Sequence, residues 1–81
     1  QIATEDAIKA VVSKYGLTDR EADVLELINM GQGNLQIAAE LGISENTVKR
    51  HVNNIFKKTE TQSRHEIIFK ISNIKEIDLQ I

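Results

Sequence analysis

The segment LQIAAELGISENTVKRHVNNIFKK, residues Leu35–Lys58, decides the fold of this chain. Its first part has apolar residues at helical spacing and stops at Gly42, a residue that readily adopts the left-handed conformation that ends a helix. Ser44 then suits the N-cap of a second helix that begins at Glu45. Because only residues 42–44 separate the two helices, they must cross, which predicts a helix-turn-helix.

The second of these helices, at residues 45–58, has two different faces. One face is apolar, with side chains at core-facing spacing, namely Val48, Val52, Ile55 and Phe56. The opposite face is basic and rich in amides, with Asn46, Arg50, Asn53 and Lys57. We therefore expect the apolar face to lie on the core and the basic face to point outward.

Charge is unevenly distributed along the chain. The formal net charge is −2 and the sequence pI is about 5.6, which taken alone argues against nucleic-acid binding. Residues 1–43 contain three basic and seven acidic residues, residues 44–70 contain six basic and three acidic ones, and the last eleven residues add a net −1. The positive charge is therefore concentrated on and just after the second helix, where a DNA backbone would meet it first.

Helix signals also occur before this motif. Thr4 is a candidate cap for a first helix that ends at Gly16, and this helix is either an extra helix packed on the domain or the end of a linker. Thr18 and Glu21 form a capping-box pattern that opens the next helix. Asn34 is placed to cap the helix after that, where free N–H groups could also hold a phosphate.

After the motif, Ser63 and Glu66 form a second capping-box pattern that opens a last helix. This helix has an apolar stripe at Ile67, Ile68, Ile71 and Ile74, with Phe69 beside it. Such a stripe more often packs in a core than forms an interface. With Phe69, however, the helix has more apolar surface than one core-facing side needs, which favours part core and part dimer contact. Residues 75–81, with Ile77, Leu79 and Ile81 alternating, could form a strand, a frayed helix or a tail.

Three segments stand at fixed distances from one another: LTDREADVLELINMG at residues 17–31, IAAELGISENTVKRHVNNIFKK at residues 37–58, and SR at residues 63–64. Together they resemble the LuxR-type (GerE-like) DNA-binding domain of bacterial transcription regulators. The combination is specific, although each segment alone would be weak evidence. The resemblance implies a helix-turn-helix domain that binds double-stranded DNA.

The outer face of the second helix contains the candidate DNA contacts. Lys49, Arg50 and Asn53 lie in its first turns, where basic and amide side chains can pair with base edges in the major groove. In the resembling family, the matching positions face the major groove, and a second set approaches the backbone, namely Glu45, Asn46, Thr47 and Lys57. Glu45 would contact a phosphate through its backbone N–H. The alternative is a solvated polar face without a ligand.

The sequence departs from the family pattern at three positions. In the family, apolar residues are usual where Thr59 and Thr61 stand. Those apolar residues anchor the last helix against the DNA-recognition helix, which corresponds to residues 45–58 here. We therefore expect a polar connector over Thr59–Gln62 and weaker docking of the last helix. Lysine is common at the position of Leu35, so one phosphate contact is expected to be missing.

No catalytic or cofactor chemistry is predicted. The chain lacks cysteine, and His51 and His65 stand fourteen positions apart without carboxylates at ligand spacing, so we expect no metal site. Neither a nucleophile with a base nor a glycine-rich phosphate loop is present. We therefore predict a binding protein without a cofactor, not an enzyme.

The sequence thus predicts an all-α bundle of four to five helices, with an N-terminal extra helix or linker remnant at 1–16, the DNA-binding domain at 17–74 and a tail at 75–81. We expect a cytoplasmic output domain of a longer transcription regulator that binds double-stranded DNA sequence-specifically, without membrane contact. In the resembling family the last helix pairs two copies, so Ile67, Ile68 and Ile71 are the predicted dimer contacts, and RNA polymerase is a further candidate partner. The alternatives are a promoter-binding module like sigma-factor region 4, and a helical protein-interaction module that has lost DNA binding.

Overall fold

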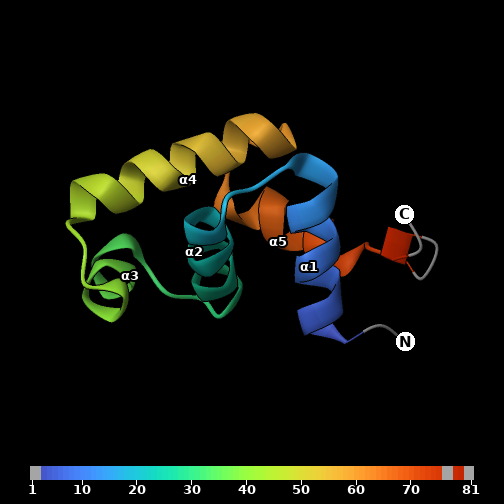
Figure 1. The fold of residues 1–81 in the computed structure, drawn as a ribbon, viewed down its shortest axis with the longest axis horizontal. Coiled ribbons are helices and arrows are strands. Elements are labelled where there is room, and N and C mark those ends of the chain that lie inside the picture. Colours follow the sequence, from blue (N-terminus) through green and yellow to red (C-terminus); the bar gives the residue numbers. More distant parts are fainter. Residues whose placement is uncertain (1–2, 76–77, 80–81) are drawn as a thin grey trace.

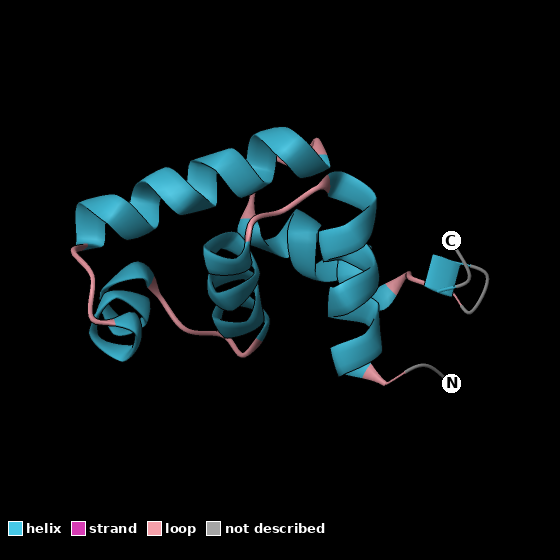
Figure 2. Ribbon diagram, in the orientation of Figure 1, coloured by secondary structure: helices cyan, strands magenta, loops and turns pink. Residues whose placement is uncertain are grey.

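A computed structural model describes residues 3–75 and 78–79, and this part of the chain folds into helices without strands (Figures 1 and 2). The helices are α1 (Thr4–Tyr15), α2 (Asp19–Asn29), α3 (Asn34–Leu41), α4 (Glu45–Thr59) and α5 (Arg64–Ser72). The predicted all-α fold is confirmed, with five helices in the described ranges.

The longest helix, α4, lies along one side of the molecule and crosses the other helices (Figure 1). It packs on α2 and α3, while α1 packs on α5 and α2. Every helix contributes to a single apolar core, whose most deeply buried members are Val11, Val24, Leu25, Ile28, Ile37, Val48, Ile55 and Ile67. The first helix is therefore an integral part of the packed domain. None of the helices in the described ranges is long and apolar enough to cross a membrane.

The turn between α3 and α4 has the predicted form. Gly42 ends α3 in the left-handed conformation, with φ of 67°. Ser44 caps α4, because its Oγ accepts a hydrogen bond of 3.1 Å from the backbone N–H of Thr47. The predicted capping box at the start of α2 is also present, since Thr18 and Glu21 exchange hydrogen bonds of 2.9 and 3.1 Å.

Two predicted N-caps were wrong by one residue. The first helix begins at Thr4 itself, after an Ala3 that provides no side-chain cap. Likewise, Asn34 is the first residue of α3, and Gly33 occupies the cap position. The N–H of Gly33 donates to the side-chain oxygen of Gln36 over 3.1 Å, so the cap group is satisfied without Asn34.

The second predicted capping box is only half formed. The hydroxyl of Ser63 accepts from the backbone N–H of Glu66 over 3.2 Å, as expected. The carboxylate of Glu66, however, accepts from the N–H of Gln62 rather than from that of Ser63. The reciprocal bond is thus made one residue earlier than predicted.

The α4–α5 junction is polar, as predicted, but its two threonines are buried while Glu60 and Gln62 are exposed. Thr59 is the fully buried last residue of α4, and its hydroxyl donates to the carbonyl of Ile55 over 2.7 Å. The hydroxyls of Thr59 and Thr61 lie 2.9 Å apart, so each buried polar group has a partner. Lys70 of α5 donates to the carbonyl of Thr59 over 2.8 Å. The last helix is therefore docked by hydrogen bonds at positions where apolar side chains were expected.

The side chains of α5 divide between core and surface. Ile67 and Ile71 are buried within the chain and belong to its core, so of the three predicted dimer contacts only Ile68 keeps appreciable exposed surface, and the pairing itself stays a prediction. Ile68 is half-buried and Phe69 is 68% exposed. Ile74 follows the end of the helix at Ser72 and is half-buried.

Residues 75–81 were predicted to form a strand, a frayed helix or a tail. Ile77 and Ile81 of the predicted alternation lie outside the described residues. Within the described part, the backbone N–H of Lys75 donates to the carboxylate of Asp78 over 2.8 Å. This contact holds Asp78 close to Lys75, three residues beyond the end of α5.

Candidate nucleic-acid interface

The outward face of α4 is exposed and cationic. Its exposed side chains are Asn46, Lys49, Arg50, Asn53 and Lys57. The opposite face is pinned to the core by Val48, Val52 and Ile55. Within residues 3–75 and 78–79, no carboxylate forms an ion pair with the cations of this exposed face. The positive charge of this face is therefore not neutralised by any of those residues.

The first turn of α4 is fixed by Ser44. Its Oγ accepts from the N–H of Thr47 and lies 2.8 Å from the hydroxyl of that same residue. Helix geometry gives the N–H groups of Glu45 and Asn46 no acceptor within the helix. Such groups at a helix N-terminus suit an anionic oxygen.

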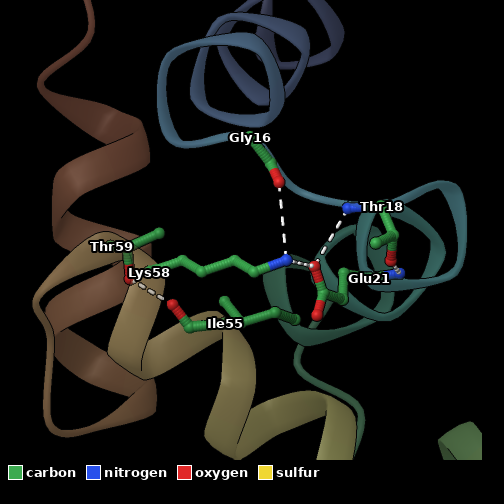
Figure 3. A network of polar contacts seen from close by, with 6 residues as sticks. All are labelled: Gly16, Thr18, Glu21, Ile55, Lys58 and Thr59. Atoms are coloured by element: carbon green, nitrogen blue, oxygen red, sulfur yellow. Dashed lines mark hydrogen bonds and ion pairs between the residues drawn. The ribbon is translucent and has the colours of Figure 1, made fainter.

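The far end of α4 is held by a buried carboxylate (Figure 3). Lys58 Nζ lies 2.7 Å from Oε1 of Glu21, at the start of α2, and 3.4 Å from the carbonyl oxygen of Gly16. The same Oε1 accepts from the N–H of Thr18, and Glu21 is only 3% exposed. The side chain of Lys58 is therefore engaged in the fold, in contrast to that of Lys57.

The environment of Glu21 shifts its titration. Burial alone raises the pKa of a carboxyl, but hydrogen bonds from Lys58 and Thr18 and the charge of Lys58 outweigh burial. The net effect holds the pKa of Glu21 below its ordinary value. Glu21 therefore remains ionised in the fold and keeps its bond to α4.

A second long-range contact holds the start of α3. Arg64, the first residue of α5, donates from Nη1 to the carbonyl of Gln32 over 3.2 Å and from Nη2 to Oδ1 of Asn34. Sequence inspection missed this role for Arg64, since its partners stand 30 and 32 residues earlier. The available signal was an arginine within the capping sequence of the last helix.

These observations give a helix-turn-helix whose second helix offers an exposed basic face. The family model "Bacterial regulatory proteins, luxR family" matches residues 15–71. The chain belongs to the LuxR family. It is a LuxR-type helix-turn-helix DNA-binding domain of transcription regulators, and it acts by binding, not by catalysis.

Individual relatives agree with this assignment. The LuxR-type chain is 35% identical to the "Spore germination protein GerE" of Bacillus subtilis over 71 residues, covering 88% of this chain and 96% of that protein. It is 54% identical over 48 residues to the "Nitrate/nitrite response regulator protein homolog" of Haemophilus influenzae, covering 59% of this chain but 23% of that protein. The solved structure of the response regulator StyR matches with a TM-score of 0.72 and 39% identity, covering 88% of this chain and 35% of that one. The chain thus spans less than a quarter of the length of the Haemophilus influenzae regulator.

The structure of this LuxR-type domain places the predicted site residues in three groups. Lys49, Arg50, Asn53 and Lys57 share the exposed face of α4, and Glu45, Asn46 and Thr47 form its first turn. Asn34 stands apart, at the start of the neighbouring helix α3. Leu35 beside it is 70% exposed.

His51 lies half-buried between the two faces of α4. Within the described ranges, no group of three His, Cys, Asp or Glu side chains could hold a metal ion. The candidate interface consists of the exposed residues of α4 together with the start of α3.

Proposed function

We propose that this LuxR-type domain recognises a specific sequence of double-stranded DNA by inserting α4 into the major groove. Arg50 and Lys49 donate to acceptors on guanine, and the amide of Asn53 pairs with adenine. The depth and width of the major groove accept a single helix, and the first turns of that helix face the base edges.

A second set of residues binds the DNA backbone in this proposal. Lys57 and the amides of Asn34 and Asn46 donate to phosphate oxygens, as do the hydroxyl of Thr47 and the backbone N–H of Glu45. These contacts set the orientation of α4 and add affinity for any sequence.

One observation supports the proposal above the others. The cations Lys49, Arg50 and Lys57 all lie on the exposed face of a helix whose other face packs on the core through Val48, Val52 and Ile55, and no described carboxylate pairs with them. A solvated helix face on a chain of net charge −2 would more commonly mix acidic and basic side chains. The separation of charge favours an anionic partner.

We further propose that two copies pair on DNA through the exposed part of α5. Phe69 and Ile68 supply apolar surface there after Ile67 and Ile71 have been used in the core. Because the proposed ligand is chromosomal DNA, the proposed place of action is the bacterial cytoplasm. Contact with RNA polymerase stays a prediction to which we assign no residues.

Selection of bound duplexes from a random DNA pool tests the function. We expect an enriched sequence with two inverted half-sites spaced about 10 base pairs apart, one turn of the double helix. An Asn53→Ala variant should enrich a motif that has lost preference at one position in each half-site. If no sequence is enriched and binding does not respond to salt, the domain is a protein-interaction module instead.

A further inference from the structure

Arg64 connects the last helix to the start of α3. It is the first residue of α5, which packs on α1 and α2, and its side chain extends this contact to the α2–α3 connector. One guanidinium nitrogen donates to the carbonyl of Gln32, and the other donates to Oδ1 of Asn34. The fork of the guanidinium thus spans the residues on both sides of the α3 cap, Gly33.

This contact dictates which way the amide of Asn34 points. A guanidinium has only donors, so it can accept no hydrogen bond from the NH₂ group of an asparagine. The carbonyl oxygen of Asn34 must therefore face Arg64, and the amide nitrogen is directed elsewhere. An amide held in this way presents its NH₂ group to an acceptor that approaches from outside.

The same contact fixes the backbone at the start of α3. The carbonyl of Gln32 is held by Arg64 over 3.2 Å, and the next N–H, that of Gly33, is held by Gln36 over 3.1 Å. Both the side chain of Asn34 and the first turn of α3 are thus ordered before any ligand binds. Ordering that is already present in the free protein reduces the entropic cost of binding.

We infer that Arg64 is a positioning residue: it holds Asn34 and the first turn of α3 in the orientation that binds a DNA phosphate, without itself contacting DNA. The inference rests on the proposed function, since it assumes that Asn34 is a backbone contact. It goes further by making a residue of α5 responsible for the geometry of α3. The helix proposed to pair two copies is thereby linked to the helix that meets the DNA backbone.

The test compares Arg64→Lys, Asn34→Ala and the double variant, with Arg20→Lys as the matched control. Lysine keeps the charge but lacks the planar fork, so it cannot hold Gln32 and Asn34 together. Arg20 is exposed, and among the described residues its ion-pair partner is Asp23 on α2, over 3.7 Å. Affinity is measured by fluorescence anisotropy on a labelled duplex from the random-pool selection and on a scrambled duplex of equal length.

We expect Arg64→Lys to weaken binding to both duplexes by about tenfold, the value of one charge-assisted hydrogen bond. Arg20→Lys should bind as the unmodified chain does. In the Asn34→Ala background, Arg64→Lys should have a clearly smaller effect, because the part of its influence that passes through Asn34 is already lost and only the contact with Gln32 remains to be removed. Undiminished binding by Arg64→Lys, or an equal loss with and without Asn34, overturns the inference.

Asn34→Asp separates positioning from a purely structural role. A carboxylate preserves the bond to Arg64, so the melting temperature should be maintained, but it removes the NH₂ donor and repels a phosphate. We expect a loss of DNA affinity of at least about tenfold in a folded protein. Unchanged affinity in Asn34→Asp overturns the inference, while failure of the unmodified chain to bind either duplex overturns the proposed function as well.

Discussion

Arg50 and Lys57 lie on the same exposed face of α4 but have different proposed tasks. Replacing Arg50 with Ala should relax the base preference at one position by about 1–3 kcal/mol, because a bidentate contact to a base is lost. Replacing Lys57 with Ala should weaken binding to all sequences and lower the salt slope by about one unit, because one phosphate contact is lost.

Titrations at several salt concentrations with cognate and scrambled duplexes distinguish these two effects. Each variant serves as the control for the other, since both remove one positive charge from α4. Equal losses on cognate and scrambled DNA for Arg50→Ala would contradict its role in reading bases.

The buried hydroxyls of Thr59 and Thr61 make a prediction about stability. Thr59→Val should cost about 1–3 kcal/mol, because it leaves the hydroxyl of Thr61 buried without its partner. Thr59→Val combined with Thr61→Val should lie close to the unmodified chain, since both polar groups are replaced by apolar groups of the same shape. Urea unfolding of both variants measures this, and a double variant less stable than Thr59→Val alone would refute the explanation.

Single residues differed in how far the sequence could predict them. The roles of Gly42, Ser44 and Thr18 were predicted correctly, because a helix cap depends on residues within one turn. Asn34 was misplaced by one residue because Gly33 takes the cap position with the help of Gln36, and its contact with Arg64 was missed because the two residues are 30 positions apart. Lys58 and Glu21 are 37 residues apart, and local patterns contain no information about such a pair.

At the scale of helices, the pair between Glu21 and Lys58 fixes the start of α2 against the end of α4. The pKa of Glu21 is lower in the fold than in the unfolded chain, so the unfolded state takes up the proton more readily. The resulting stabilisation is complete above the unfolded pKa of about 4.3 and is lost as the pH falls through the lower folded value.

Glu21→Gln should therefore be less stable at neutral pH by about 1–3 kcal/mol and should lose less stability than the unmodified chain on acidification. Glu26→Gln, an exposed position on the same helix, is the matched control and should keep the acid response. Urea unfolding between about pH 3 and pH 7 measures the difference. An identical pH dependence for Glu21→Gln and the unmodified chain would exclude the ion pair as its source.

Helix boundaries followed the same division between local and distant causes. The bounds of α4 came within one residue of the prediction, because Ser44 and a strong apolar stripe define them. The end of α4 extended to Thr59, since the turn at Glu60 adopts the left-handed conformation, with φ of 57°, although it contains no glycine. That turn buries Thr59 and Thr61, although a polar Thr-Glu-Thr sequence is typical of a solvent-exposed connector.

For the molecule as a whole, the two halves differ in charge, and only the basic half contains α4. Residues 1–43 have an excess of four acidic residues and residues 44–70 an excess of three basic ones. In the fold, α4 lies along one side of the molecule (Figure 1), and its exposed cations Lys49, Arg50 and Lys57 have no carboxylate partner among the described residues. The net charge of the chain is therefore a poor guide to DNA binding, because the proposed ligand would meet only the basic face.

Pairing of two copies through α5 gives a prediction for the whole assembly. Phe69→Ser should weaken cooperative binding to a duplex with two half-sites by about 10- to 100-fold, because burying a large apolar side chain contributes about 1.5–3 kcal/mol. Binding to a single half-site should be unchanged, since Phe69 lies on α5 and not on α4. Met30→Ser is the matched control: Met30 is 70% exposed and Phe69 68%, but Met30 caps α2. Titrations of one-site and two-site duplexes measure both quantities, and a loss of cooperativity shared by Phe69→Ser and Met30→Ser would place the interface somewhere other than α5.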